Sequence, residues 1–139
     1  MEALYTAEAR SLGSGRIGSV RTTDGAVDLI LAPPKAFGGV GTGTNPEQLF
    51  AAGYAACFHS AVLGAARAEG VQADGSSVTA RVSIGRIDAN AYGLQVDLVV
   101  LLPHVERGTA RLLTEIAHRN CPYSNATRGN VVVAITVAG

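Results

Sequence analysis

The chain has 139 residues, a length that fits one domain with a buried core, and no shift in composition marks a second domain. Its formal net charge is zero, from 11 basic and 11 acidic residues without a run of like charge, which argues against nucleic acid or an anionic membrane as the main partner. The N-terminus lacks the apolar segment of a secretory signal, and the longest unbroken apolar runs are too short to span a membrane. We therefore expect one cytoplasmic domain, residues 1–139, in which a lone pair of cysteines is more often catalytic, redox-sensing or metal-binding than a structural disulfide.

The first third of the chain has the pattern of short strands. Residues 3–11 and 17–31 are predicted as strand segments, and Asp24-Gly25 divides the second one as a two-residue hairpin turn. Pro33-Pro34 ends this sheet, and the glycine-rich stretch 38–44 predicts a loop. That loop lacks the glycine spacing and the Gly-Lys-Ser/Thr ending of phosphate-binding motifs, so we assign it no ligand.

A long helix is predicted next. Asn45 is its cap and forms, with Gln48, a pattern that resembles a capping box, while Pro46 occupies the first helical position. The helix can run to Glu69, because a glycine follows it. Residues 49–63 are apolar on nearly every side, so the helix is expected to be buried in its own core or against a partner.

The rest of the chain is predicted to contain three further strands and a second helix. Strands are predicted at 76–87, 92–102 and 131–137, and a second helix at 104–120 that ends before Pro122. One face of this helix carries apolar residues at helical spacing: Ala110, Leu113, Ile116 and Ala117. Three strands, a helix, two strands, a helix and a strand make an α+β fold.

The two cysteines lie in the two most distinctive stretches. Cys57 is in the middle of the first helix, where no helix N-terminus is expected to lower the pKa of its thiol and apolar burial would raise it. Lowering the pKa of a thiol by about two units takes roughly 2.7 kcal/mol of preferential thiolate stabilisation, within reach of one poorly hydrated arginine. Periodicity alone favours a small core residue for Cys57. For Cys121 it favours neither of two alternatives, a buried cysteine at a helix end or a functional thiol.

These stretches resemble the Ohr/OsmC family of thiol-dependent peroxidases. Thr44-Asn45-Pro46-Glu47, followed by an apolar helix with Cys57, is similar to both branches of the family. The stretch 121–130, Cys-Pro-Tyr-Ser-Asn-Ala-Thr-Arg-Gly-Asn, resembles the organic hydroperoxide resistance (Ohr) branch and not its OsmC relatives. With Gly15-Arg16-x-Gly18, the resemblance covers nearly the whole chain. It implies an Ohr/OsmC-like fold of antiparallel sheets with two main helices, in an intertwined homodimer.

The resemblance also implies an activity and the residues that carry it. Cys57 would be the peroxidatic cysteine that attacks an alkyl or fatty-acid hydroperoxide, and Cys121 the resolving cysteine that forms a disulfide with it. Arg16 would stabilise the thiolate and Glu47 would orient Arg16. A dithiol reductant, a protein-bound lipoyl group, would reopen the disulfide. The motif context carries these roles, since Arg16 and Glu47 alone are typical of surface charges.

The positions of Glu47 and Cys57 raise a geometric difficulty. On one straight helix they lie about 15 Å apart along the axis and are rotated by roughly 80°. One arginine cannot easily bridge both. Either the helix breaks near Gly53, or Glu47 comes from the other subunit of a dimer, and we favour the shared site.

An apolar channel is expected around Cys57. Large side chains would line it and small ones would leave room: Leu49, Phe50, Tyr54, Phe58, Val62 and Leu63, with Gly53, Ala55, Ala56 and Ala61. The three histidines have no zinc-binding spacing, so neither a metal nor a cofactor is expected, and His59 is interpreted as a polar group satisfied in the core or interface. Asn125 and Arg128 are expected to fix the loop after Cys121.

Two other functional classes fit the same residues. One is a redox sensor in which oxidation of the cysteine pair alters a partner surface without turnover. The other is a binding or assembly domain in which the thiols are inert.

Overall fold

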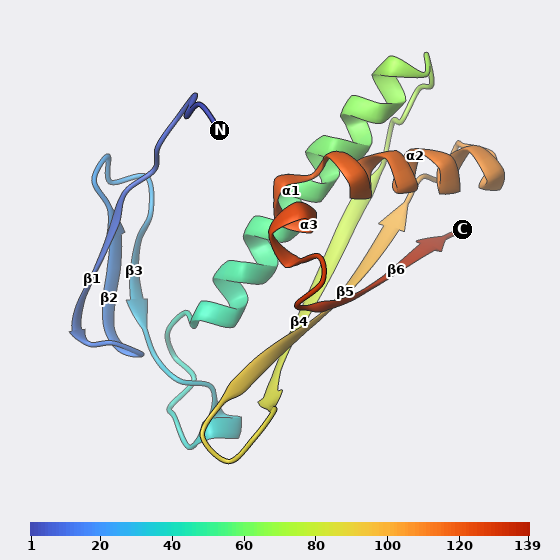
Figure 1. Ribbon diagram of the computed structural model, residues 1–139. Helices are drawn as coiled ribbons and strands as arrows, with labels where there is room; N and C mark the ends of the chain where they lie inside the picture. The colour runs from blue at the N-terminus through green and yellow to red at the C-terminus, as the bar shows by residue number, and fades with distance from the viewer. The chain divides into compact units, whose positions relative to one another are not determined.

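The computed structural model describes residues 1–139 and divides into two compact units, Met1–Leu49 and Phe50–Gly139. The boundary between them falls in the first turn of helix α1 (Pro46–Ala68). Figure 1 gives the order of the elements, three strands, a helix, two strands, two helices and a final strand, so the chain has the predicted α+β class.

The first unit contains a three-stranded antiparallel sheet. Its strands are β1 (Ala9–Ser14), β2 (Ile17–Thr22) and β3 (Asp28–Leu31), in that order. The first strand was predicted at 3–11, which is wrong by several residues. The reason is a second hairpin turn at Gly15 and Arg16, which pairs Ser14 with Ile17 and so extends β1 toward the turn.

The loop after β3 returns along that strand before α1 begins. A short 3₁₀ helix, Lys35–Phe37, starts it, and the Thr44 backbone then pairs with Ile30 and Ala32 at 2.9 and 3.0 Å. Gly43 permits this close approach, because a Cβ atom there would lie 2.8 Å from the Ala32 nitrogen and the Ile30 oxygen. The predicted loop therefore sets where α1 starts.

The second unit contains a mixed sheet. Strands β4 (Ser77–Arg86) and β5 (Tyr92–Leu101) form an antiparallel hairpin, and β6 (Val132–Ala138) pairs with β5 in parallel. The expected antiparallel pairing thus holds for β4 and β5, and β6 adds one parallel strand to it. A parallel pair needs a crossover connection, and helices α2 (Arg107–Asn120) and α3 (Pro122–Thr127) form it here.

The core of this unit lies between its sheet and its helices. Alternate residues of β5 point into it, together with one stripe of α1 and the apolar face of α2. Its best-buried members are Tyr54, Phe58, Val62, Val96, Leu98, Val100, Leu113 and Ala117. The long helix was predicted within one residue at each end, and the second began three residues later than predicted. Helix α3 was missed, because Pro122 was interpreted only as a stop for α2, whereas it also occupies the first position of a new helix.

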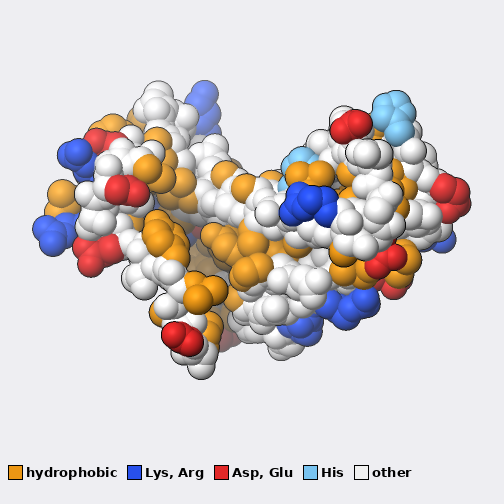
Figure 2. All heavy atoms as spheres, turned by 90° about the horizontal axis from the view of Figure 1, so that it is seen from above, with side chains coloured by type: hydrophobic (Ala, Val, Ile, Leu, Met, Phe, Trp, Pro, Cys, Tyr) orange, Lys and Arg blue, Asp and Glu red, His pale blue; other side chains and the backbone are white.

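Helix α1 is buried on one side only within the chain. Its opposite side carries small exposed residues at helical spacing, Ala52, Ala56 and Ser60. By length and a mean hydropathy of 1.5, α1 could also cross a membrane, a property that core helices of globular proteins share. Figure 2 shows further hydrophobic side chains at the surface, and Leu12, Ile30, Ile87 and Val132 are each more than half exposed.

Candidate active site

The two cysteines meet in the second unit. Cys57 lies in the middle of α1 and is half-buried, whereas Cys121 is fully buried. Both are free thiols, and the Cys121 Sγ donates a hydrogen bond to the Cys57 Sγ at 3.4 Å. Residues 64 positions apart are therefore in contact through their sulfur atoms. The pairing implied by the family resemblance thus has the contact it requires.

Cys121 is held at a bend between two helices. Its backbone is extended, with φ −67° and ψ 123°, and it both ends α2 and caps α3. Pro122 disfavours a helical conformation for the residue before it, which explains the bend. The Cys121 amide still donates to the Ala117 carbonyl at 2.8 Å, so the residue is tied to α2 by its backbone while its side chain faces α1.

The surroundings of Cys57 have opposing effects on its thiol. Burial raises the pKa of Cys57 most, a hydrogen bond from the Tyr123 backbone lowers it, and the neighbouring Cys121 raises it again, with a net increase. The Tyr123 amide belongs to the first turn of α3. This donor was not predicted, because α3 was not. Since the net pKa shift is upward, a working thiolate needs a further positive charge.

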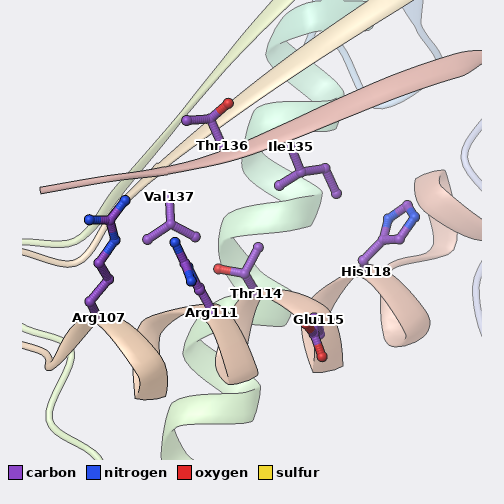
Figure 3. Close-up of a pocket in the computed structure, with 8 residues that line it drawn as sticks. All are labelled: Arg107, Arg111, Thr114, Glu115, His118, Ile135, Thr136 and Val137. Carbon is purple, nitrogen blue, oxygen red and sulfur yellow. The ribbon is translucent and has the colours of Figure 1, made fainter.

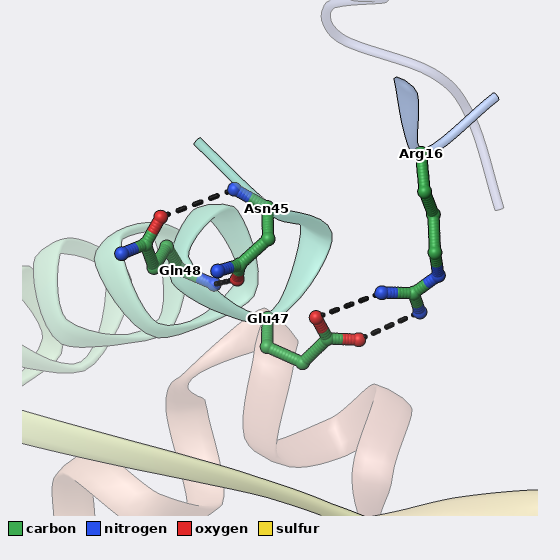
Figure 4. Close-up of polar contacts among 4 residues, drawn as sticks. All are labelled: Arg16, Asn45, Glu47 and Gln48. Carbon is green, nitrogen blue, oxygen red and sulfur yellow. Dashed lines mark hydrogen bonds and ion pairs between the residues drawn. The ribbon is translucent and has the colours of Figure 1, made fainter. Parts of the chain in front are cut away.

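Arg16 and Glu47 form a bidentate ion pair in the first unit (Figure 4). The guanidinium Nη2 and Nη1 atoms donate to Glu47 Oε1 and Oε2 at 2.7 and 3.0 Å. The hydrogen bonds between them lower the pKa of Glu47 and raise that of Arg16. Arg16 is placed by the turn between β1 and β2, and Glu47 by the first turn of α1.

The capping box fixes the start of α1 next to this ion pair. The Asn45 amide donates to Gln48 Oε1 at 3.1 Å, and the Gln48 amide donates to Asn45 Oδ1 at 2.9 Å, as predicted. Glu47 lies between these two residues, so the cap fixes the backbone from which its carboxylate extends (Figure 4). The ion pair provides the contact that Glu47 needs if it is to orient Arg16, as expected. The role of the pair toward a thiolate stays a prediction.

Helix α1 is continuous from Pro46 to Ala68, so the proposed break near Gly53 is wrong. Gly53 instead leaves space for the Tyr123 ring, whose hydroxyl oxygen would lie 2.8 Å from a Cβ atom at this position. The ion pair lies within the first unit and the cysteine pair within the second. Supply of Arg16 and Glu47 to Cys57 by the same chain or by its partner stays a prediction.

A groove of about 410 Å³ opens beside Cys57. It follows α1 toward its C-terminal end and is lined mostly by small and apolar side chains, namely Cys57, Ser60, Ala61, Gly64, Ala65, Ala68, Ile116, Asn120 and Pro122. Of the expected channel residues only Ala61 lines it. Tyr54, Phe58 and Val62 are fully buried in the core, because the side of α1 that carries them faces the sheet.

The polar residues around Cys121 are satisfied within the chain. Arg128 donates to Asn125 Oδ1 at 2.8 Å and to the His118 carbonyl at 2.7 Å, which confirms that these residues fix the segment after Cys121. His59 Nε2 is bonded to Ser76 Oγ at 3.0 Å, as expected for a satisfied polar group. A third set was not predicted from any motif. Its members are hydrogen-bonded to one another across three helices: Tyr54, Ser124, Thr127 and His118.

Comparison with known proteins identifies the family. The sequence model of one protein family, described as OsmC-like protein, matches residues 39–136. The organic hydroperoxide resistance protein of Xanthomonas axonopodis pv. citri is 44% identical over 137 residues, covering 97% of this chain and 95% of the relative. The corresponding protein OhrB of Bacillus subtilis is 42% identical over 134 residues, covering 96% and 97%.

Solved structures agree with this assignment. An organic hydroperoxide resistance protein from Legionella pneumophila superimposes with a TM-score of 0.95 at 45% identity, covering 99% of this chain and 100% of that one. One from Vibrio cholerae, with captopril bound in one of its active sites, gives 0.94 at 45% identity and covers 100% and 95%. With the paired cysteines in the same fold, the chain belongs to the organic hydroperoxide resistance branch of the OsmC/Ohr family.

Proposed function

We propose that the protein is a thiol-dependent peroxidase that reduces organic hydroperoxides to alcohols. The observation that carries this proposal is the 3.4 Å contact between the Cys57 and Cys121 sulfur atoms. A half-buried thiol with a buried thiol in contact is the arrangement that a peroxidatic and a resolving cysteine need. The names of the similar proteins from Xanthomonas and Bacillus support the same reaction class.

The reaction has three balanced steps. The Cys57 thiolate attacks the outer oxygen of the hydroperoxide, the O–O bond breaks, and the departing alkoxide takes a proton to leave as the alcohol, with Cys57 as sulfenic acid. The Cys121 sulfur then attacks the Cys57 sulfur, an S–S bond forms, and the hydroxyl leaves as water with the Cys121 proton. A dithiol reduces this disulfide by exchange and becomes a disulfide itself.

Arg16 supplies the positive charge in this proposal, and Glu47 orients it. A bidentate carboxylate fixes both the position and the plane of a guanidinium, which a lysine in the same place would not allow. Nearly half of the Arg16 side chain is exposed, at 46%, so the guanidinium keeps a free face for a thiolate.

The groove beside Cys57 suits substrates with an apolar tail. Each buried methylene is worth about 0.8 kcal/mol, so a few of them amount to roughly a hundredfold in kcat/KM over hydrogen peroxide. The same groove fits a dithiol on an apolar arm, and we propose a protein-bound lipoyl group as the reductant, in the cytoplasm. Competition of an alkyl hydroperoxide against hydrogen peroxide, with dihydrolipoamide or thioredoxin as reductant, checks both choices. Equal efficiency with hydrogen peroxide would contradict the first, and faster turnover with thioredoxin the second.

The roles of the two cysteines are tested by single substitutions. Cys57→Ser should abolish turnover, because an alcohol lacks the nucleophilicity of a thiolate. Cys121→Ser should consume about one peroxide per site and then stop or over-oxidise to sulfinic acid. Intact-protein mass spectrometry of the peroxide-treated wild type should find the loss of two hydrogens. A sulfenic acid on Cys121 would reverse the roles, and one stoichiometric oxidation without turnover would indicate a sensor.

A further inference from the structure

A chain of hydrogen bonds between mostly buried side chains ties helices α1, α2 and α3 together. His118 Nδ1 of α2 lies 2.9 Å from Ser124 Oγ of α3, which lies 2.9 Å from the Tyr54 hydroxyl of α1. The Tyr54 hydroxyl lies 3.2 Å from Thr127 Oγ1, again of α3. Tyr54 and Ser124 are fully buried, and Thr127 is 5% exposed. We refer to these four residues as the hydroxyl chain.

The direction of the hydroxyl chain depends on where Thr127 donates its one proton. Thr127 Oγ1 lies 2.9 Å from the Tyr123 carbonyl and 3.2 Å from the Ser124 carbonyl, and both can only accept. When Thr127 donates to a carbonyl, Tyr54 donates to Thr127 and Ser124 to Tyr54, since each hydroxyl has one proton. Ser124 Oγ then accepts from His118. We assign this direction, in which His118 carries a proton on Nδ1 in both its neutral and its charged form.

His118 lies at one edge of an open pocket. A pocket of about 420 Å³ lies between α2 and β6, and the imidazole lies at one end of it, away from Arg107 (Figure 3). The ring packs beside Phe58, with centroids 6.3 Å apart, and the backbone carbonyl of His118 accepts from Arg128. The donor at the head of the hydroxyl chain is thus fixed in place while its ring stays half-buried.

Helix α3 is the element that the hydroxyl chain fastens, through two of its six residues. The same helix is capped by Cys121, and its first turn holds the Tyr123 amide that hydrogen-bonds Cys57. Six residues are too few for a helix to be stable alone, so the position of α3 depends on side-chain contacts of this kind. The Cys121 thiol that contacts the Cys57 sulfur, and the Tyr123 backbone that lowers its pKa, therefore both depend on the position of α3.

We propose that His118, Ser124 and Tyr54 are positioning residues for the peroxidase reaction, which hold the start of α3 so that the Cys121 thiol and the Tyr123 amide face Cys57. This rests on the proposed function. Loss of the hydroxyl chain should let α3 shift by up to about an ångström. Such a shift slows the attack of Cys121 on the sulfenic acid. Such a displacement costs about tenfold to a hundredfold in rate. Slow resolution leaves the sulfenic acid exposed to a second peroxide, so sulfinic acid should accumulate.

The test uses Tyr54→Phe and Ser124→Ala, which remove one hydroxyl each. It also uses two substitutions of His118, the donor of the hydroxyl chain. His118→Leu removes the donor, whereas His118→Asn keeps an N–H donor near the Nδ1 position and should restore function. Thr114→Val is the matched control, because Thr114 is a buried hydroxyl of α2 that bonds only the Ala110 carbonyl. Rapid quenching with an alkylating agent after one equivalent of peroxide, followed by mass spectrometry, gives the rate of disulfide formation and the sulfinic fraction.

We expect the disulfide to form at least about tenfold more slowly in Tyr54→Phe, Ser124→Ala and His118→Leu, and at a near wild-type rate in His118→Asn and Thr114→Val. Wild-type rates in the first three variants would overturn the proposal, even if their melting temperatures fall. In a Cys121→Ser background, the pKa of Cys57 should rise in the same three variants. That arm still tests the hydroxyl chain if the wild type forms no disulfide, an outcome that would contradict the proposed function. Nitrogen NMR must find His118 protonated at Nδ1, and a neutral ring protonated only at Nε2 would refute the assigned direction.

Discussion

The thiol of Cys57 is placed where burial works against its chemistry. Burial and the neighbouring Cys121 raise its pKa, and the Tyr123 amide offsets only part of that increase. An unperturbed thiol with a pKa of about 8.5 is already only a few per cent thiolate at neutral pH. We therefore predict that the nucleophile depends on a nearby cation, the role that the proposed function gives to Arg16. A guanidinium keeps its charge in such a setting, because its pKa stays far above neutral pH.

Replacement of Arg16 by alanine tests that dependence. The pKa of Cys57 should rise and peroxide attack should slow by about two orders of magnitude, because thiolate stabilisation of roughly 2.7 kcal/mol is lost. Glu47→Ala should have the same effect more mildly, since it removes the orienting group and not the charge. Thiolate absorbance against pH gives the pKa. Arg21→Ala is the control, because Arg21 forms only an exposed 3.7 Å pair with Asp28 in the same sheet. An unchanged titration in Arg16→Ala would exclude Arg16 from this role.

His118 should make folding stability depend on pH. Burial lowers the pKa of His118 from its ordinary value of 6.5, and the charge of Arg128 lowers it further. The unfolded chain thus binds the proton more readily, so this contribution to stability is complete above a pH of 6.5 and is lost as the pH falls from there to the folded pKa. When the pH is lowered from about 7.5 to 5.5, the melting temperature of the wild type should fall further than that of His118→Asn. Equal losses would contradict this, and His104→Asn, at an exposed histidine, is the control.

The elements divide into those that local sequence determines and those that it does not. Helix α1 was predicted almost to the residue because its signals are adjacent in the chain, a reciprocal cap at Asn45 and Gln48 and a terminal Gly70 with φ 66°. The start of α3 and the second hairpin turn were missed, because proline and glycine mark an end and a beginning equally well. The parallel pairing of β6 depends on how the crossover packs, which no local pattern encodes.

The candidate site divides in the same way. The motifs identified Cys57, Cys121, Arg16 and Glu47, and the structure brings them together as two separate pairs. The hydroxyl chain could not be predicted. Tyr54 and Ser124 are 70 residues apart, and a tyrosine within an apolar helix is as typical of a core as of a network. The channel residues were misassigned because hydrophobicity alone does not say which side of an apolar helix faces the sheet.

The two interior glycines of α1 should respond to alanine in opposite ways. Alanine in a helix interior is worth about 1 kcal/mol over glycine. At Gly64 the nearest atom to a new Cβ is an Arg67 nitrogen at 3.9 Å, so Gly64→Ala should gain that stability. At Gly53 the new Cβ would lie 2.8 Å from the Tyr123 hydroxyl and 3.2 Å from its ring, so Gly53→Ala should gain nothing and should displace Tyr123. Urea unfolding compares the two, and a similar gain at Gly53 would contradict the steric argument.

At the scale of the whole molecule, exposed apolar side chains in both units favour assembly with a second copy. Leu12, Ile30, Ile87 and Val132 are more than half exposed. The side of α1 away from its core carries small residues every fourth position, which would let a second helix approach closely. We therefore expect a homodimer, as the family resemblance implies. A purely monomeric chain in analytical ultracentrifugation at micromolar concentration would contradict it.

A homodimer would also resolve how Arg16 and Glu47 reach a cysteine ten residues further along an unbroken helix. The pair is formed within one chain, so both residues must serve the same site, and we predict that this site contains the partner's cysteine. Arg16→Ala chains, expected to be about a hundredfold slower, and Cys57→Ser chains, expected to be inactive, are unfolded together and refolded as a mixture. If the pair acts across the dimer, half of the dimers are mixed and each has one intact site, so activity should return to about a quarter of the wild type. If the pair acts within its own chain, no mixed dimer has an intact site and activity should not return. Mixing Arg16→Ala with Glu47→Ala is the control, because both changes damage the same pair and no combination should restore a complete site beside Cys57.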